Sequence, residues 1–294
     1  MVASSRSVPD GSVPQDPLVR LAALPGVAQE IERARQACET LRWHPAMRRR
    51  SAECRAESAV WAARASAALE GARLPISLVR DAVRGARELP QDPAGQVVAG
   101  ATRAVAEAER LSERGARAIA DAPRQALVRL HLAAVSGVVP DERVGRPRRG
   151  DERPRGADTG MPPAPAATEA TARLDALVAL LEAPSRAPVL VLAAVASAEI
   201  LTAAPFVDGN GVVARALARA LVVGRGLDPM GVAVPEAAVL ADPSGYALAL
   251  TGYATGTSEG VAAWLRFCAG TVVAGAAEGT VIADAVLAGR TPRT

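Results

Sequence analysis

The chain has 294 residues, half of them apolar and only 2% aromatic, a length that accommodates one sizeable core or one core with an appended helical part. Its formal net charge of +3 is small and does not indicate a nucleic-acid partner, although arginine supplies all of the positive side chains. Three widely spaced cysteines without a C-x-x-C pair argue against a disulfide framework and against a cysteine zinc site.

The N-terminal part of the chain predicts a tail followed by helices. Residues 1–16 are polar and lack an apolar run behind a basic start, so we expect a disordered tail and a cytoplasmic protein. Residues 17–90 carry apolar side chains at three- and four-residue spacing with arginines on the other face, which predicts helices over 18–43 and 45–70. Prolines after residue 70 then mark the next helix boundaries.

Residues 91–290 predict an all-α core that one loop interrupts. Helical spacing of apolar residues covers these ranges: 94–122, 124–135, 168–182, 188–202, 212–224, 244–254 and 258–287. Between them, residues 139–167 are rich in arginine, proline and glycine, which predicts a flexible, solvated loop. The apolar run 187–207 contains prolines and a glutamate, so a buried helix explains it better than a membrane span.

The segment from Ala204 to Arg215 carries the clearest functional signal. Its central residues do not pack into a core: Asp208, Gly209, Asn210 and Gly211. The residues after them have helical spacing, so the segment leads into a helix N-terminus, where exposed N–H groups favour an anion and glycines let a phosphate approach. Asp208 is suited to hold Mg²⁺ that bridges phosphate oxygens, and Arg215 offers a guanidinium fork. These residues therefore predict a nucleotide phosphate site.

Other interpretations of the same residues remain open. Asp-Gly-Asn-Gly is also a common surface turn. The spacing Gly209-x-Gly211-x-x-Ala214, with Asp228 near the position of a ribose contact, fits a loose dinucleotide fingerprint, but that fingerprint follows a strand and helical sequence surrounds it here. A calcium loop would need a bidentate glutamate at its twelfth position, where this chain has Arg219.

The whole segment, A-P-F-V-D-G-N-G-V-V-A-R, resembles the signature loop H-P-F-x-D/E-G-N-G-R-x-x-R of the Fic (Fido) domain family, which includes protein adenylyltransferases. The frame is kept, but Ala204 stands at the catalytic histidine and Val212 at the first arginine. The resemblance implies an all-α Fic-type domain that takes ATP and Mg²⁺, with the metal on Asp208. It also implies that residues 139–167 form a target-binding flap with a short hairpin within 139–161.

A second motif lies far upstream in the chain. Ser66-Ala-Ala-Leu-Glu70-Gly71 resembles the inhibitory motif S/T-x-x-x-E-G/N, which precedes the core in one class of Fic proteins. The resemblance implies that Glu70 pairs with Arg215 and prevents a bound nucleotide from placing its γ-phosphate productively. The simpler interpretation of Glu70-Gly71 is an ordinary helix end, since glycine commonly terminates helices.

The two substitutions in the signature loop bear on catalysis. By the family resemblance, the missing histidine is the general base, and removal of a general base typically costs ~10² to 10⁴ in rate. Neither histidine of this chain is expected to replace it: helical spacing places His131 in the core or at its boundary, and His44 lies at a helix junction.

Two classes of function remain open. The first is a catalytically impaired Fic protein that acts as a nucleotide- or protein-binding regulatory module. The second is an active nucleotidyl or phosphoryl transferase with another base or another donor, and an NAD-binding oxidoreductase is a remote third. We expect a protein target or partner, with neither nucleic acid nor a membrane as partner.

Overall fold

The structure is a computed structural model that describes residues 16–155 and 163–292. Over these ranges the chain is all-α, as expected: it forms no strand, and its single β-bridge joins Ser136 to Val139. The elements follow in chain order: α1 (Pro17–Ala22), α2 (Val27–Arg42), η1 (Pro45–Arg48), α3 (Ser51–Leu69), α4 (Ile76–Val83), α5 (Pro93–Glu113), α6 (Ala118–Asp121), α7 (Pro123–Val135), η2 (Asp141–Arg143), α8 (Ala167–Glu182), α9 (Val189–Ala203), α10 (Asn210–Gly224), α11 (Pro235–Ala241), α12 (Pro243–Ala254) and α13 (Ser258–Leu287).

Proline and glycine divide two of the predicted helices. The helix expected over 18–43 is broken at Pro25-Gly26, where Gly26 takes the left-handed conformation at the N-cap of α2. The helix expected over 94–122 ends at Glu113, and Gly115, at φ 99°, separates α5 from α6. The helix expected over 45–70 becomes η1 and α3, and the short helices α4 and α11 were not predicted.

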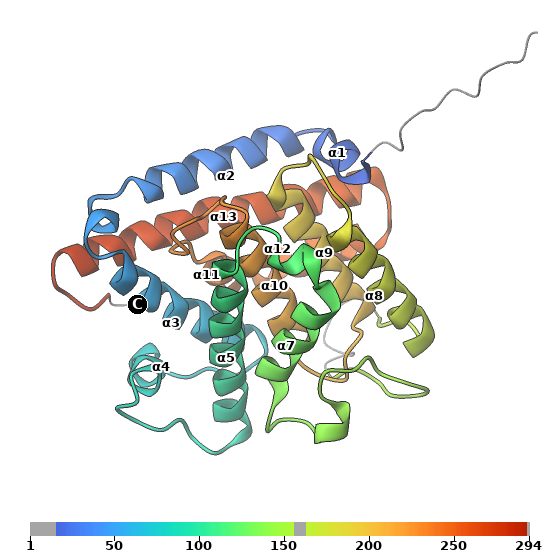
Figure 1. Cartoon of the computed structure of the whole chain (residues 1–294), viewed down its shortest axis with the longest axis horizontal. Helices are drawn as coiled ribbons and strands as arrows, with labels where there is room; N and C mark the ends of the chain where they lie inside the picture. Colours follow the sequence, from blue (N-terminus) through green and yellow to red (C-terminus); the bar gives the residue numbers. More distant parts are fainter. Residues whose placement is uncertain (1–15, 156–162, 293–294) are drawn as a thin grey trace, which may run out of the picture.

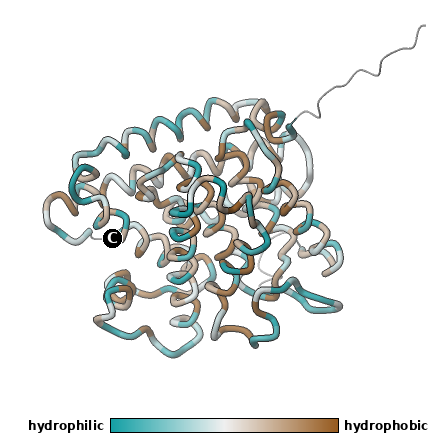
Figure 2. Tube along the Cα trace, viewed as in Figure 1, coloured by the Kyte–Doolittle hydropathy of each residue, from teal (hydrophilic) through white to brown (hydrophobic). Residues whose placement is uncertain are grey.

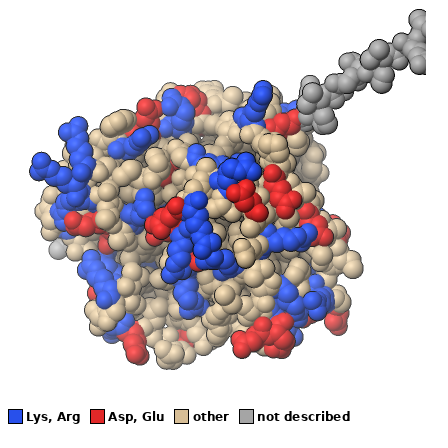
Figure 3. Space-filling view, viewed as in Figure 1, with Lys and Arg blue, Asp and Glu red and all other residues tan. Residues whose placement is uncertain are grey.

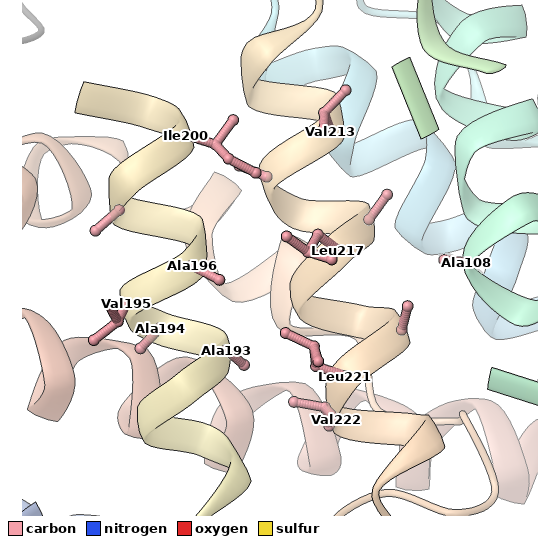
Figure 4. Close-up of a cluster of buried hydrophobic side chains, with 14 of the residues drawn as sticks. Ala108, Ala193, Ala194, Val195, Ala196, Ile200, Val213, Leu217, Leu221 and Val222 are labelled. Carbon is pink, nitrogen blue, oxygen red and sulfur yellow. The ribbon is translucent and has the colours of Figure 1, made fainter. Parts of the chain in front are cut away.

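Helices α9 and α10 form the centre of the molecule. Figure 1 shows α13 running alongside α2, with α3, α5 and α7 on the other side of the central pair. Small side chains allow α9 and α10 to approach closely, and Figure 4 shows Ala193 and Ala196 of α9 facing Leu217 and Leu221 of α10. The interior is thus built from Ala, Val and Leu, as the aromatic-poor composition implies.

The polar outer surface carries charges of both signs. Helix α2 is hydrophilic along its exposed side (Figure 2), where Arg35 bridges Glu32 and Glu39. Figure 3 shows arginines and acidic residues interspersed over one face of the molecule. Such exposed pairs contribute little to stability, so the fold depends on its packed interior.

Two apolar helices bear on membrane association. The run 187–207 forms α9, which is largely buried, as expected. Helix α13, which was not among the membrane candidates expected from the sequence, is long and apolar enough to cross a membrane by length and composition alone. In the structure α13 packs against α2, α11 and α12, and 44% of its most apolar stretch is buried.

The expected flap hairpin does not form within residues 139–155, and that prediction is wrong there. The segment folds as η2 and turns, and two of its backbone N–H groups donate to the signature loop: Arg148 to Pro205 O at 2.7 Å and Arg155 to Val207 O at 2.8 Å. Prolines at 140, 147 and 154 remove further donors. The remaining part of the expected hairpin, like most of the expected tail, lies outside the described residues.

Candidate functional site

The signature loop joins the two central helices. Helix α9 ends at Ala203, and Ala204 takes the left-handed conformation with φ 42°, the only residue other than glycine to do so among those described. The chain then turns through Pro205 to Asp208, and α10 begins at Asn210. The loop follows a helix and not a strand, so the dinucleotide-fingerprint interpretation is wrong.

Glycine is required at the start of α10. Gly209 forms the N-cap at φ 74°, and a Cβ atom there would lie 2.5 Å from Cγ1 of Val135 on α7. Helix α7 is itself held close by Gly100 of α5, where a Cβ would lie 2.0 Å from the carbonyl oxygen of Ala134. The start of α10 therefore depends on the close packing of α5, α7 and α10.

Asn210 and Phe206 fix the shape of the loop. The Asn210 side chain accepts a hydrogen bond from Phe206 N at 3.0 Å and donates to Phe206 O at 2.8 Å. The buried Phe206 ring stacks on the His131 ring with centroids 4.0 Å apart. The side-chain amide of Asn210, which was predicted to bind a nucleotide, thus bonds to the backbone of the loop.

His131 is buried and connects α7 to the flap and to the signature loop, and its burial agrees with its place in a helical pattern. Its Nδ1 accepts a hydrogen bond from Gly145 N at 2.8 Å, and its Nε2 lies 3.2 Å from Asp208 O. His44, at the predicted helix junction, caps η1 by accepting a hydrogen bond from Ala46 N. Neither ring faces the space in front of α10 as a free base.

We predict that burial of His131 lowers the free energy of unfolding at acidic pH. Burial lowers the pKa of His131 to about 4, whereas the unfolded ring titrates near ~6.5. The unfolded chain therefore binds the proton more readily, so this contribution is complete above pH ~6.5 and is lost as the pH falls towards 4, by up to about 3 kcal/mol. Urea unfolding at pH 7 and pH ~4.5 should show a larger drop for wild type than for His131→Asn. Equal drops would contradict the assignment.

Arg148 fastens the flap to the signature loop. Its guanidinium is buried and donates to four carbonyl oxygens, those of Ala203 at 3.2 Å, Ala204 at 2.6 Å, Glu152 at 3.2 Å and Pro165 at 2.6 Å. Two of these carbonyls end α9, where a cation complements the helix dipole. The sequence alone does not distinguish this arginine from the other five of the flap.

The left-handed residue Ala204 predicts a measurable effect on stability. A side chain at positive φ costs roughly 1–2 kcal/mol, so Ala204→Gly should stabilise the fold by about 1 kcal/mol. The control Ala198→Gly, in the interior of α9, should destabilise it by about 1 kcal/mol or more. Chemical denaturation of the two variants tests this, and a loss of stability in Ala204→Gly would contradict the strain.

The two distant motifs meet at Arg215, as the resemblance implied. The Arg215 Nη2 lies 2.6 Å from Glu70 Oε1 and 3.0 Å from the carbonyl oxygen of Ser66, and its Nε donates to the Ser66 hydroxyl at 2.9 Å. Arg215 is buried, while the Glu70 carboxylate is partly exposed. Gly71 follows at φ 87° and ends the helix.

The carboxylate of Glu70 also lies against the first turn of α10. A Cβ atom on Gly211 would come within 2.1 Å of Glu70 Oε1 and 3.1 Å of Arg215 Nη1. The negative group therefore stands where the exposed N–H groups of a helix N-terminus favour an anion. Glu70 and a phosphate would compete for this position.

A cavity of about 520 Å³ opens in front of α10. Its size falls in the range of small-molecule sites, roughly 300–1,000 Å³. All five residues that were predicted to bind a nucleotide line it, together with Glu70 and Gly71: Asp208, Gly209, Asn210, Gly211 and Arg215. The ionisable side chains among its described lining residues are these: Glu70, Arg155, Asp208, Arg215 and Tyr246.

Asp208, the predicted metal ligand, is engaged by the protein itself. Its Oδ1 accepts a hydrogen bond from Gly209 N at 2.7 Å, and Arg155 Nε lies 3.0 Å from its Oδ2 as an ion pair. Burial raises the pKa of the Asp208 carboxyl above its ordinary value. Arg155, like Arg148, belongs to the flap and was missed by sequence analysis.

The two substituted positions lie beside the cavity. Ala204 and Val212 both line it and are both largely buried, and Val212 is part of the main apolar cluster. Arg219, one turn after Arg215 on α10, does not replace the missing arginine, because its guanidinium donates to the carbonyl oxygens of Gly231 and Ala233. It does not reach the signature loop.

A family model covers the centre of the site. Residues 121–222 match the model described as the Fic/DOC family, a segment that spans α7 to most of α10 and includes the signature loop but not Glu70. Among curated proteins none matches the chain.

Solved structures of similar fold support the architecture. A Fic family protein from Desulfovibrio desulfuricans G20 is 21% identical with a TM-score of 0.60, over 93% of this chain and 76% of that one. Residues 134–508 of Fic-1 from C. elegans are 17% identical with a TM-score of 0.64, over 90% and 73%. A Fic domain containing signaling protein from Bacteroides thetaiotaomicron VPI-5482 is 16% identical with a TM-score of 0.65, over 90% and 100%. At these identities the likeness concerns the fold.

Proposed function

The chain is a Fic domain protein, and from that premise we propose that it binds the phosphates of a nucleotide in the cavity in front of α10 without transferring AMP to a protein. The observation that carries this proposal is the replacement of the base by a methyl group. Ala204 lies at the edge of a cavity that otherwise keeps an anion-binding helix start and a buried arginine.

The cavity suits a phosphate ligand. The N-terminus of α10 supplies backbone N–H groups, Gly211 leaves room for close approach, and Arg215 supplies a charged donor that is already positioned by Ser66. Val212 offers no charge at the position where the family motif has its first arginine. ATP and ADP are therefore the ligands that we propose, bound with fewer charged contacts than in an intact signature loop.

Among the described residues that line the cavity, none offers a free base for proton transfer. A transferase of this kind must take the proton from the attacking hydroxyl of its target. Among the described lining residues, Glu70 and Asp208 are paired with arginines, and burial raises the pKa of Tyr246 to about 12, so that its hydroxyl stays protonated. His131 lies behind the loop with both ring nitrogens in contact with backbone groups.

Glu70 gives the site a regulatory contact. Because its carboxylate occupies both Arg215 and the start of α10, a nucleotide phosphate must displace it before binding fully. Whatever withdraws α3 or neutralises Glu70 would then expose the anion site. We propose that the protein works as a nucleotide- or protein-binding regulatory module. That it has a protein partner and that it lies in the cytoplasm are predictions from its sequence.

Titration calorimetry with ADP tests the proposal. Wild type should bind ADP weakly, and Glu70→Gly should bind it roughly 10- to 100-fold more tightly, as expected when a competing charge-assisted contact to Arg215 is removed. Glu53→Gly is the matched control, because Glu53 lies on the same helix but outside the cavity, and its affinity should equal that of wild type. No heat from ADP in any of the three proteins would contradict a nucleotide site and leave a protein-binding surface.

A further inference from the structure

The flap places an arginine on the carboxylate that a metal would use. Arg155 Nε lies 3.0 Å from Asp208 Oδ2, with 16% of the Asp208 side chain exposed. No described residue donates a well-directed hydrogen bond to that oxygen, so the guanidinium acts on it as a neighbouring charge. The other oxygen of Asp208 is taken by Gly209 N.

This arrangement does not fit Mg²⁺. The ion demands near-ideal octahedral oxygen ligands at roughly 2.0–2.1 Å, usually one or two carboxylates with phosphates and waters. A guanidinium beside Asp208 Oδ2 puts a like charge next to that position. Among the described residues no group of three His, Cys, Asp or Glu side chains offers an alternative metal site.

We propose that Arg155 is the resident cation of this site and that the cavity binds nucleotide phosphates without a metal ion. The inference rests on the proposed function and specifies its chemistry. Arginine is suited to the task because its planar fork can contact a carboxylate along one edge and a phosphate along another.

The backbone of the flap keeps this arginine in place. Arg155 N donates to Val207 O at 2.8 Å, and Arg148, seven residues earlier, is pinned to the same loop through its backbone and its guanidinium. The side chain of Arg155 is largely exposed beyond this anchor and can turn between Asp208 and a ligand. The positive charge beside Asp208 is therefore the Arg155 guanidinium, which belongs to the protein, and not a metal ion bound from solution.

The charges around the cavity balance without any ion. Glu70 and Asp208 face Arg215 and Arg155, one carboxylate for each guanidinium. When a phosphate takes the place of Glu70 on Arg215, Arg155 remains beside it as a second positive charge. An anion with two or more negative charges, such as a nucleoside diphosphate, fits this pair of arginines.

The test is ADP affinity in the Glu70→Gly background, measured by calorimetry with excess MgCl₂ and again with EDTA. Affinity should differ by less than about threefold between the two buffers. Arg155→Gln in that background should bind ADP roughly 10- to 100-fold more weakly in EDTA, as expected for loss of a charge-assisted contact, and should recover with MgCl₂. Arg153→Gln is the control, because Arg153 is an exposed arginine of the same flap that does not line the cavity.

Three outcomes would overturn the inference. Two results would contradict the role of Arg155 and leave nucleotide binding intact. One is a requirement for MgCl₂ in the Glu70→Gly protein, and the other is an Arg155→Gln variant that binds ADP as tightly as its parent in EDTA. ADP binding by none of these proteins in either buffer would contradict the proposed function as well.

Discussion

Neither the wild-type chain nor its Glu70→Gly variant should attach labelled AMP to protein when incubated with ATP and Mg²⁺. Ala204 has no proton acceptor, and loss of a general base typically costs ~10² to 10⁴ in rate. Val212 adds the loss of a charge-assisted phosphate contact. In a Fic protein with an intact signature loop, removal of the inhibitory glutamate should raise activity, so Glu70→Gly separates the loop defect from the inhibition.

Restoring the loop should restore transfer. Ala204→His with Val212→Arg, in the Glu70→Gly background, should recover measurable AMP incorporation, because both positions line the cavity and histidine is among the residues that tolerate positive φ. Ala204→Gln with Val212→Arg is the control of similar size that lacks a base. Because Arg155 holds Asp208, the restored protein should also be assayed with Arg155→Gln.

The outcomes of this experiment separate the possible functions. AMP incorporation by the unmodified chain would contradict the impaired-enzyme account and favour an active transferase with another base or donor. A restored variant that fails to bind ATP would show that the cavity serves another ligand or a protein surface.

Arg148→Met should be the most damaging single substitution in the flap. It removes a buried guanidinium that donates to four carbonyl oxygens and leaves those at the end of α9 without partners. Since a hydrogen bond to a charged group contributes about 1.5–3 kcal/mol, and losses above about 4 kcal/mol are rare for one substitution, we expect a loss of about 3 kcal/mol in the free energy of unfolding.

The neighbouring Arg149→Met provides the matched control for this change. The Arg149 side chain is exposed, so its loss should cost less than about 0.5 kcal/mol. Urea unfolding of both variants measures the difference. A loss below about 1 kcal/mol for Arg148→Met would mean that the flap is not held by this guanidinium.

The helical fold could be predicted from the spacing of its apolar residues, but the ends of several helices could not. Pro25-Gly26 and Gly115 break helices whose apolar pattern continues past them, because a left-handed glycine changes the chain direction without disturbing that pattern. The short helices α4 and α11 have too few turns to show a period. Both begin beside a proline that was visible in the sequence.

Some residues of the candidate site could likewise be predicted from the sequence, and others could not. The signature loop and the Ser66–Gly71 motif were visible because their residues are unusual at fixed spacing, and the structure brings Glu70 to Arg215. The flap arginines were not visible, because six arginines share one loop of uniform composition and only the fold decides that Arg148 is buried. The hairpin was predicted from resemblance alone, and here the flap backbone bonds to the signature loop instead.

A crystal structure of the Glu70→Gly variant with ADP would test the central claim most directly. The account predicts that the diphosphate lies against the first turn of α10, with Arg215 on one phosphate and Arg155 between the ligand and Asp208. ADP density elsewhere on the protein, or an Arg215 that stays on Ser66 without touching the ligand, would contradict it.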